Sequence, residues 1–310
     1  MIKRFFTLPT ILYFILLYVA FTDGVIKTDD STAFIVVLTG IEMFFIYTEF
    51  KYSVRNGSKP KERLLQDSRR DITSIIFAVM LWWELTTKVF GLVSKVLFPP
   101  LDNVFYVFVE DYPDMLRGIV NSLYLVFSGV GSGTVAGVVV GLLVGWIPRL
   151  RNTVAPIANV VAAIPALIYA PYVVAISPSF KLASIFVIFL GCFWPTLMNM
   201  IGNIAGADKK LLDSARSLNL GTVSMLFKVL LPYSVYPIIA NLRIRVADAF
   251  MVLTFAEMIG SNVGLGFYVK RWSNFAKYNK VFAGIILIGV VVTAINKLIK
   301  LFENKFVRWK

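Results

Sequence analysis

Histidine is absent from this sequence of 310 residues, and cysteine occurs once, as Cys192. The absence of histidine removes the side chain that most often serves as a general base, and also a common metal ligand. The single cysteine allows no internal disulfide, and its apolar surroundings in IFVIFLGCFWP favour a buried, unreactive thiol. Metal-dependent catalysis and acid–base catalysis within this chain therefore have little support.

Charged residues are also scarce, at 16% of the sequence against about 25% in a typical soluble domain. Apolar residues make up 58%, and the mean hydropathy is +0.76. Nowhere does the sequence contain the phosphate-binding pattern GxxxxGK[ST]. These features exclude an ordinary soluble protein. They predict an all-α polytopic membrane protein without a nucleotide site of its own.

A helix that crosses a membrane needs about 20 mainly apolar residues. Eight such segments are predicted, at residues 5–22, 33–50, 72–92, 117–146, 154–177, 182–204, 233–258 and 281–299. The first follows a basic start and resembles a secretory signal. No small-x-small cleavage site follows it, so we expect it to remain as a span.

The distribution of basic residues predicts the orientation in the membrane. The net charge of +13 could indicate nucleic-acid binding, but the charges are not spread evenly. With a cytoplasmic N-terminus, twenty basic residues fall inside, nine fall outside and two lie within a span. The loop after residue 260 is the exception, with Lys270, Arg271, Lys277 and Lys280 outside. Because cytoplasmic loops carry the excess of Lys and Arg, both termini are predicted to be cytoplasmic.

The basic segment 51–71 is the best internal boundary, and it is predicted to be a cytoplasmic linker. It separates an N-terminal transmembrane hairpin, 1–50, from a larger transmembrane domain, 72–310. The hairpin is expected to be peripheral to any path through the protein. Glu42, the one charge within it, should face protein or the membrane interface.

Glycine recurs at every fourth residue in SGVGSGTVAGVVVGLLVG, which could be mistaken for a nucleotide loop. On a helix these residues form one stripe without side chains, against which another helix can pack closely. The stripe therefore predicts packing within the bundle; it consists of Gly129, Gly133, Gly137, Gly141 and Gly145.

Four prolines fall within 23 residues, at Pro156, Pro165, Pro171 and Pro178. A proline inside a helix removes a backbone hydrogen bond and costs about 3 kcal/mol or more. The freed carbonyl then needs a neighbouring helix or a water-lined cavity. These prolines indicate either a broken helix lining a path or kinks that serve packing.

Charged side chains occur inside the segment NLRIRVADAFMVLTFAEMIG, where they are costly unless they pair or face water. Arg245 and Asp248 are three residues apart and can pair on one helix face. Glu257 is interpreted as path lining, with a structural role as the alternative. The candidate path residues are Pro165, Pro171, Asn199, Arg243 and Glu257.

Residues 206–231 form a polar insertion between two apolar segments. Asp208 can cap a helix that begins at Lys209. An apolar face follows, while LNLG ends the helix with residues that tolerate left-handed backbone. A second short amphipathic run, VSMLFKVLLP, leads into the next span. This pattern favours two short helices for docking a cytosolic partner, or alternatively helices on the membrane surface; the apolar face consists of Leu211, Leu212, Ala215 and Leu218.

The stretch DSARSLNLGTVSMLFKVLLP resembles the EAA loop of ABC importer permeases, which reads Glu-Ala-Ala, three residues, Gly, and later Leu-Pro. These positions are occupied, in order, by Asp213, Ser214, Ala215, Asn219 and Leu231-Pro232. Further matches, to the nitrate/sulfonate/taurine/bicarbonate-type permeases, are LWWEL, FPP, FWPTLMN, FAEMIG and GLG. The resemblance covers about residues 75–305. Departures are Asn219 for Gly, Ser214 for Ala, AISPS at 175–179, and Leu125 where the family often has Arg.

The resemblance implies a type I ABC importer permease, with a six-helix core and the N-terminal hairpin as an extension. It implies a small, anionic or sulfonate-like solute delivered by an extracytoplasmic binding protein, a second permease copy or paralogue, and a bacterial inner membrane. It implies no cofactor bound directly, since ATP and Mg²⁺ belong to a partner ATPase, and no catalytic residue. The residues expected to couple to that ATPase are Asp213, Ser214, Ala215, Arg216, Asn219, Gly221, Leu231 and Pro232.

Two other classes of function were compared with this one. A stand-alone secondary transporter or channel would be supported by inverted repeats, and no convincing internal repeat is found. An intramembrane enzyme is disfavoured by the lack of histidine and of paired intramembrane carboxylates.

Reporter fusions test the predicted topology. Fusions at residues 60, 105 and 215 should read cytoplasmic, external and cytoplasmic, because the basic loops lie inside. An external reading at residue 60 would contradict the arrangement of two spans followed by six.

Overall fold

The computed structural model describes residues 7–22, 30–54, 60–94 and 96–306. Within these ranges the chain is helical between short turns and contains no strand, so the all-α prediction is confirmed. The helices form two compact units. Unit 1 comprises the described residues up to Met115 together with Arg271–Ile285, and unit 2 comprises Leu116–Lys270 and the described residues from Ile286 onward.

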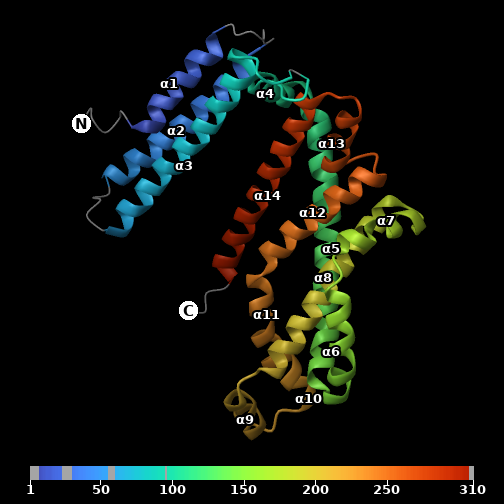
Figure 1. Ribbon diagram of the computed structural model, residues 1–310. Helices are drawn as coiled ribbons and strands as arrows, with labels where there is room; N and C mark the ends of the chain where they lie inside the picture. The colour runs from blue at the N-terminus through green and yellow to red at the C-terminus, as the bar shows by residue number, and fades with distance from the viewer. Residues whose placement is uncertain (1–6, 23–29, 55–59, 95, 307–310) are drawn as a thin grey trace. The chain divides into compact units, whose positions relative to one another are not determined.

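Unit 1 contains the predicted N-terminal hairpin and the helices packed against it. Its elements are α1 (Leu8–Phe21), α2 (Thr32–Val54), α3 (Pro60–Glu84), the π-helical turn η2 (Leu85–Val89) and α4 (Leu101–Glu110) (Figure 1). One buried cluster joins all four α-helices, through Leu16, Phe34, Leu38, Phe77 and Phe105. The hairpin is therefore integrated with α3 and α4 by a shared apolar core.

Glu42 lies within this hairpin and is almost fully buried. Its carboxylate accepts a hydrogen bond of 2.8 Å from the hydroxyl of Thr10 on α1. The expectation that Glu42 faces protein is confirmed.

A buried ion pair joins the segments around η2 in unit 1. The Lys88 ammonium lies 2.7 Å from a carboxylate oxygen of Asp102 and donates to the backbone carbonyl of Ala20 at 3.0 Å. Glu84 accepts a hydrogen bond of 2.6 Å from the backbone N–H of Leu101, where α4 begins. Because buried charges are costly unless they are paired, these contacts hold the end of α1, η2 and the start of α4 together. This cluster could not be predicted from the sequence, because no periodic pattern relates its residues.

Unit 2 contains the other described helices, of which α5, α8 and α14 are the longest. Its elements are α5 (Tyr112–Trp146), α6 (Pro148–Ala162), α7 (Ala166–Ile176), α8 (Phe180–Ala205), α9 (Lys209–Ser217), α10 (Thr222–Ser224), the π-helical turn η3 (Met225–Leu230), α11 (Leu231–Ala240), α12 (Leu242–Gly260), α13 (Leu265–Asn274) and α14 (Tyr278–Phe306). Three of these helices, α5, α13 and α14, also have residues in unit 1. Figure 1 shows α9 and α10 at the end of unit 2 where α6 begins.

The glycine stripe of α5 packs against α8, as predicted. A methyl group added at Gly141 would lie 2.5 Å from the Cβ of Met200, and one at Gly129 would lie 2.6 Å from that of Ile188. The three stripe positions Gly133, Gly137 and Gly145 similarly face Cys192, Thr196 and Ile204. Both sets of residues advance by four in the same direction, so the two helices run parallel. This fits the predicted topology, in which both cross the membrane in the same direction.

The number of candidate spans agrees with the prediction only at its upper limit. Among the described residues, six helices are long and apolar enough to cross a membrane, or up to eight if each of two bent pairs is one span. The first predicted span corresponds to α1, an apolar helix of 14 residues that is not among those six or eight candidates. The predicted span 233–258 is wrong as a single helix, because the chain breaks at Asn241 between α11 and α12. Hydropathy alone could not show a break inside an apolar run.

Of the two alternatives left open for the prolines, the structure contains the broken helix. α6 and α7 are separated at residues 163–165 and bent by 87° relative to each other. Pro165 is the residue before α7, whereas Pro156 and Pro171 lie inside helices without ending them. The second bent pair, α12 and α13, turns by 45°.

The α5–α8 contact can be tested with one substitution at two positions. Gly141→Ala should lower the free energy of unfolding of the purified protein by about 1–3 kcal/mol, the usual cost of overpacking, and should therefore lower its melting temperature. Gly131→Ala on the same helix is the matched control, because a methyl group there meets nothing within 4 Å. Equal melting temperatures for the two variants would show that α5 and α8 are not in tight contact.

Candidate functional site

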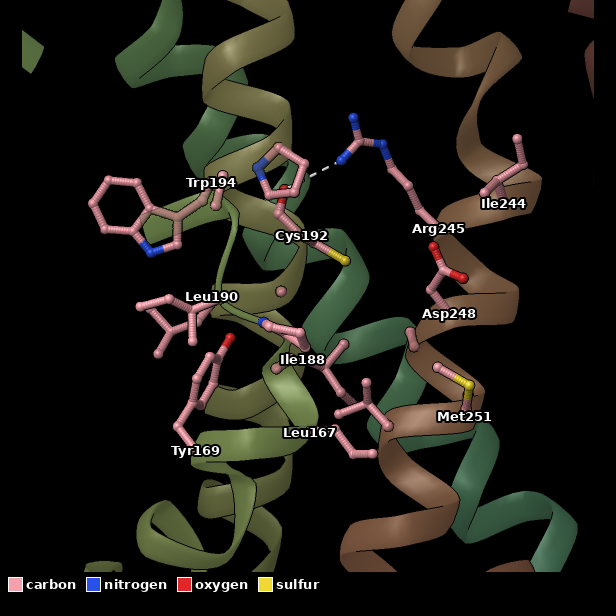
Figure 2. Close-up of a pocket in the computed structure, with 18 of the residues that line it drawn as sticks. Leu167, Tyr169, Ile188, Leu190, Cys192, Trp194, Ile244, Arg245, Asp248 and Met251 are labelled. Atoms are coloured by element: carbon pink, nitrogen blue, oxygen red, sulfur yellow. Dashed lines mark hydrogen bonds between the residues drawn. The ribbon is translucent and has the colours of Figure 1, made fainter. Parts of the chain in front are cut away.

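A cavity of about 460 Å³ lies within unit 2, where the break between α6 and α7 faces α8 and α12. Its wall is mostly apolar and aromatic, and Figure 2 shows the side chains that converge on it. The lining includes Pro165, Tyr169, Cys192, Trp194, Arg245 and Asp248. Two helix interruptions border this space: Ile164, between α6 and α7, and Asn241, between α11 and α12, both line it. Helix interruptions free backbone polar groups, so a cavity is where they are tolerated at membrane depth.

Arg245 of α12 is the buried cation of this cavity, with only 9% of its surface exposed. One terminal nitrogen, Nη1, donates to the hydroxyl of Thr196 at 2.9 Å and to the carbonyl of Cys192 at 3.3 Å. Its Nε is buried and has no hydrogen-bond partner among the described residues. Arg245 therefore spans from α12 to α8 and retains an unused N–H.

The predicted pairing of Arg245 with Asp248 is not the contact that forms. Arg245 bonds to α8 instead, and no ion pair between the two side chains occurs in the described part of the chain. Asp248 lines the cavity and is exposed. Sequence spacing allowed an i, i+3 pair, but the acceptors offered by α8 across the cavity could not be read from spacing.

The candidate path residues divide between the cavity and other positions. Pro165 lines the cavity, whereas the other four are not among its lining residues: Pro171, Asn199, Arg243 and Glu257. Arg243 lies 3.5 Å from the carboxylate of Glu303 on α14. Arg245 was not among the candidate path residues, although its position inside an apolar segment is a signal that could have included it.

Glu257 holds the turn between α12 and α13. One carboxylate oxygen accepts from the hydroxyl of Ser122 on α5, and the other from the backbone N–H of Gly266, both at 2.7 Å. Gly264 has a φ of +143°, and a Cβ there would collide with the Glu257 carboxylate. The buried carboxylate thus replaces backbone hydrogen bonds that an irregular turn cannot make. This geometry supports a structural role for Glu257, which was the alternative to path lining.

The polar insertion has the local geometry that its sequence predicts. Asp208 accepts from the backbone N–H of Lys210 at 2.9 Å and so caps α9. Asn219 has a φ of +50°, the left-handed conformation that Asn tolerates better than most residues. Gly221 is the residue before α10, and the chain then continues without a non-helical break through α11. The second predicted short helix is therefore the start of a longer one.

The apolar face of α9 is divided between this chain and the surface. Ala215 is 5% exposed, and Leu212 packs with it in a cluster that includes Leu226 of η3. Leu218, by contrast, is 74% exposed. Ala215 is therefore part of the core of the insertion, whereas Leu211 on α9 and Leu218, the residue directly after α9, are exposed.

The remaining coupling candidates whose side chains are described lie on α9 and at the start of α11. Asp213 and Ser214 are exposed on α9, and Leu231 and Pro232 begin α11. The side chain of Arg216 lies outside the described residues.

Comparisons with known proteins agree with this architecture. The model of one family, described as the binding-protein-dependent transport system inner membrane component, matches residues 112–308. The chain belongs to this family. The match spans unit 2 from the start of α5 to the end of α14, and so includes the cavity and the insertion with α9.

Three curated relatives are transport permeases. SsuC of Bacillus subtilis (strain 168), assigned to aliphatic sulfonates transport, is 28% identical over 77% of this chain and 86% of its own length. The nitrate import permease NrtB of Leptolyngbya laminosa is 30% identical over 49% of this chain and 54% of its own length. The taurine transport system permease TauC of Escherichia coli (strain K12) is 24% identical over 77% of this chain and 88% of its own length.

A solved structure of the MetNI methionine ABC transporter in an inward facing conformation has the same fold. The TM-score is 0.54 at 20% identity, covering 63% of this chain and 95% of that chain. Together with the family match, these findings identify a multi-pass membrane protein that is the permease subunit of an ABC importer.

Proposed function

We propose that the cavity beside Arg245 is part of the path along which this permease subunit carries a small anionic solute. The observation that carries this proposal is the buried guanidinium, whose Nε has no acceptor among the described residues. A buried charge is costly unless it is paired, so an anion in the cavity would offset the charge of this guanidinium. The substrates named for the relatives, aliphatic sulfonates, nitrate and taurine, support a solute that bears a strong acid group.

The same proposal assigns ATP hydrolysis to a separate subunit. The sequence contains no GxxxxGK[ST] pattern, and the permease relatives are components of larger transport systems. A partner ATPase would bind the surface around Leu218 and the Asn219 turn, and a binding protein would deliver the solute from the other side. A second permease copy or paralogue would complete the path. The excess of basic residues at the α9 end supports a cytoplasmic location for that surface and for both termini, in a bacterial inner membrane.

A transporter or channel that acts alone is the second candidate, and none of these observations favours it. Purification in mild detergent distinguishes the two. An importer permease should bring an ATPase subunit with it, whereas a stand-alone transporter should not.

Substitution of Arg245 tests the anion site. Arg245→Gln should weaken binding of ethanesulfonate and taurine to the purified complex by about ten- to a hundredfold, since a hydrogen bond to a charged group contributes about 1.5–3 kcal/mol. Arg117→Gln, at an exposed position of α5, is the matched control and should bind like the unaltered protein. Unchanged affinity in Arg245→Gln would remove the basis for this cavity as the anion path.

Substitution of Leu218 tests the coupling surface. Burying a leucine against a partner stabilises a complex by about 1.5–3 kcal/mol, so Leu218→Asp should lower ATPase copurification and substrate-stimulated hydrolysis at least about tenfold. Leu182→Asp carries the same change at a 58% exposed position at the start of α8, and it should retain the ATPase. Full ATPase binding by Leu218→Asp would show that this surface does not dock the partner.

A further inference from the structure

The cavity carries one charge of each sign. Among the described residues that line it, Arg245 and Asp248 are the two with formally charged side chains at neutral pH. Both belong to α12 and are three residues apart, a spacing that places their Cβ atoms about 5–6 Å from each other on one helix face. Figure 2 shows the Arg245 side chain extending from α12 toward α8, and the Asp248 side chain beside α12 near the base of Arg245.

These two charges do not neutralise each other by direct contact. The Arg245 guanidinium is turned to α8, where it donates to Thr196 and the carbonyl of Cys192. The Asp248 carboxylate has no hydrogen bond or ion pair with any described residue, and its side chain is exposed. Each charge is therefore available to a molecule in the cavity.

A simple monoanion fits this arrangement only in part. It would be attracted by Arg245, but it would also lie near the Asp248 carboxylate, which repels it in a site of lower dielectric than water. A solute with both an acid group and an amino group can satisfy both side chains at once. The aromatic rings of Tyr169 and Trp194 line the same cavity and would tolerate an ammonium group.

We propose that the cavity selects a small zwitterion, with its acid group at Arg245 and its ammonium group at Asp248. This inference rests on the proposed function of the cavity as the solute path, and it narrows the solute from anions in general to amino acids or aminosulfonates of short chain length. Asp248 is then the residue that distinguishes an amino-bearing solute from the corresponding plain anion.

Two pairs of probes separate these possibilities, because each pair differs mainly in the amino group. Taurine is compared with ethanesulfonate, and β-alanine with propionate, by equilibrium binding to the purified permease–ATPase complex. The unaltered protein should bind at least one zwitterion about tenfold or more tightly than its plain anion. Asp248→Asn should weaken binding of that zwitterion about tenfold and leave the plain anion equal or tighter. Asp114→Asn, exposed at the start of α5, is the matched control and should change neither.

The outcomes distinguish this inference from the proposed function on which it rests. Equal binding within both pairs, or unchanged zwitterion binding in Asp248→Asn, would overturn the inference. If Arg245→Gln still weakened the binding of both members of a pair, the proposed anion path would stand even though the zwitterion inference had failed. If Arg245→Gln changed no affinity, or if none of the four probes bound, both would be overturned. Elution volume and melting temperature of each variant show whether a loss of binding reflects a loss of fold.

Discussion

The close contact between α5 and α8 is the constraint on which unit 2 depends. Each glycine of the stripe faces an α8 side chain at a distance that leaves no room for a Cβ. Two of the facing residues, Cys192 and Thr196, are also the acceptors of Arg245. The packing of two apolar helices thus fixes the position of the acceptors that hold the cavity's cation. A displacement of α8 by the width of one methyl group would therefore move both acceptors of Arg245.

Irregular backbone in this protein is stabilised by buried polar side chains. Glu257 occupies both of its oxygens at the α12–α13 turn, and Glu84 binds the first backbone N–H of α4. Such groups are expensive in an apolar interior, and they persist because unpaired backbone groups would cost as much or more. The breaks that border the cavity, near Pro165 and Asn241, therefore lie in a chain in which two other irregular points are held by buried carboxylates.

Local features could be predicted from the sequence, and contacts between distant segments could not. The glycine stripe, the Asp208 cap and the left-handed Asn219 follow from spacing and from the conformational preferences of single residues. The prolines allowed a break but did not show that it would fall at residues 163–165. The partner of Arg245 depends on which helix lies across from it, and the burial of Ala215 depends on η3 folding back over α9. The Lys88–Asp102 pair joins residues on either side of a loop, and no periodic pattern relates them.

Cys192 makes the cavity open to chemical labelling at a single position. It is the single cysteine of the sequence, and it lines the cavity between the two charged side chains and the aromatic wall. A thiol-directed reagent that enters the cavity can therefore attach to this chain at one position only. Because only 4% of its surface is exposed, this thiol reacts slowly while the cavity is closed, so the rate of labelling at Cys192 would report how often the cavity opens.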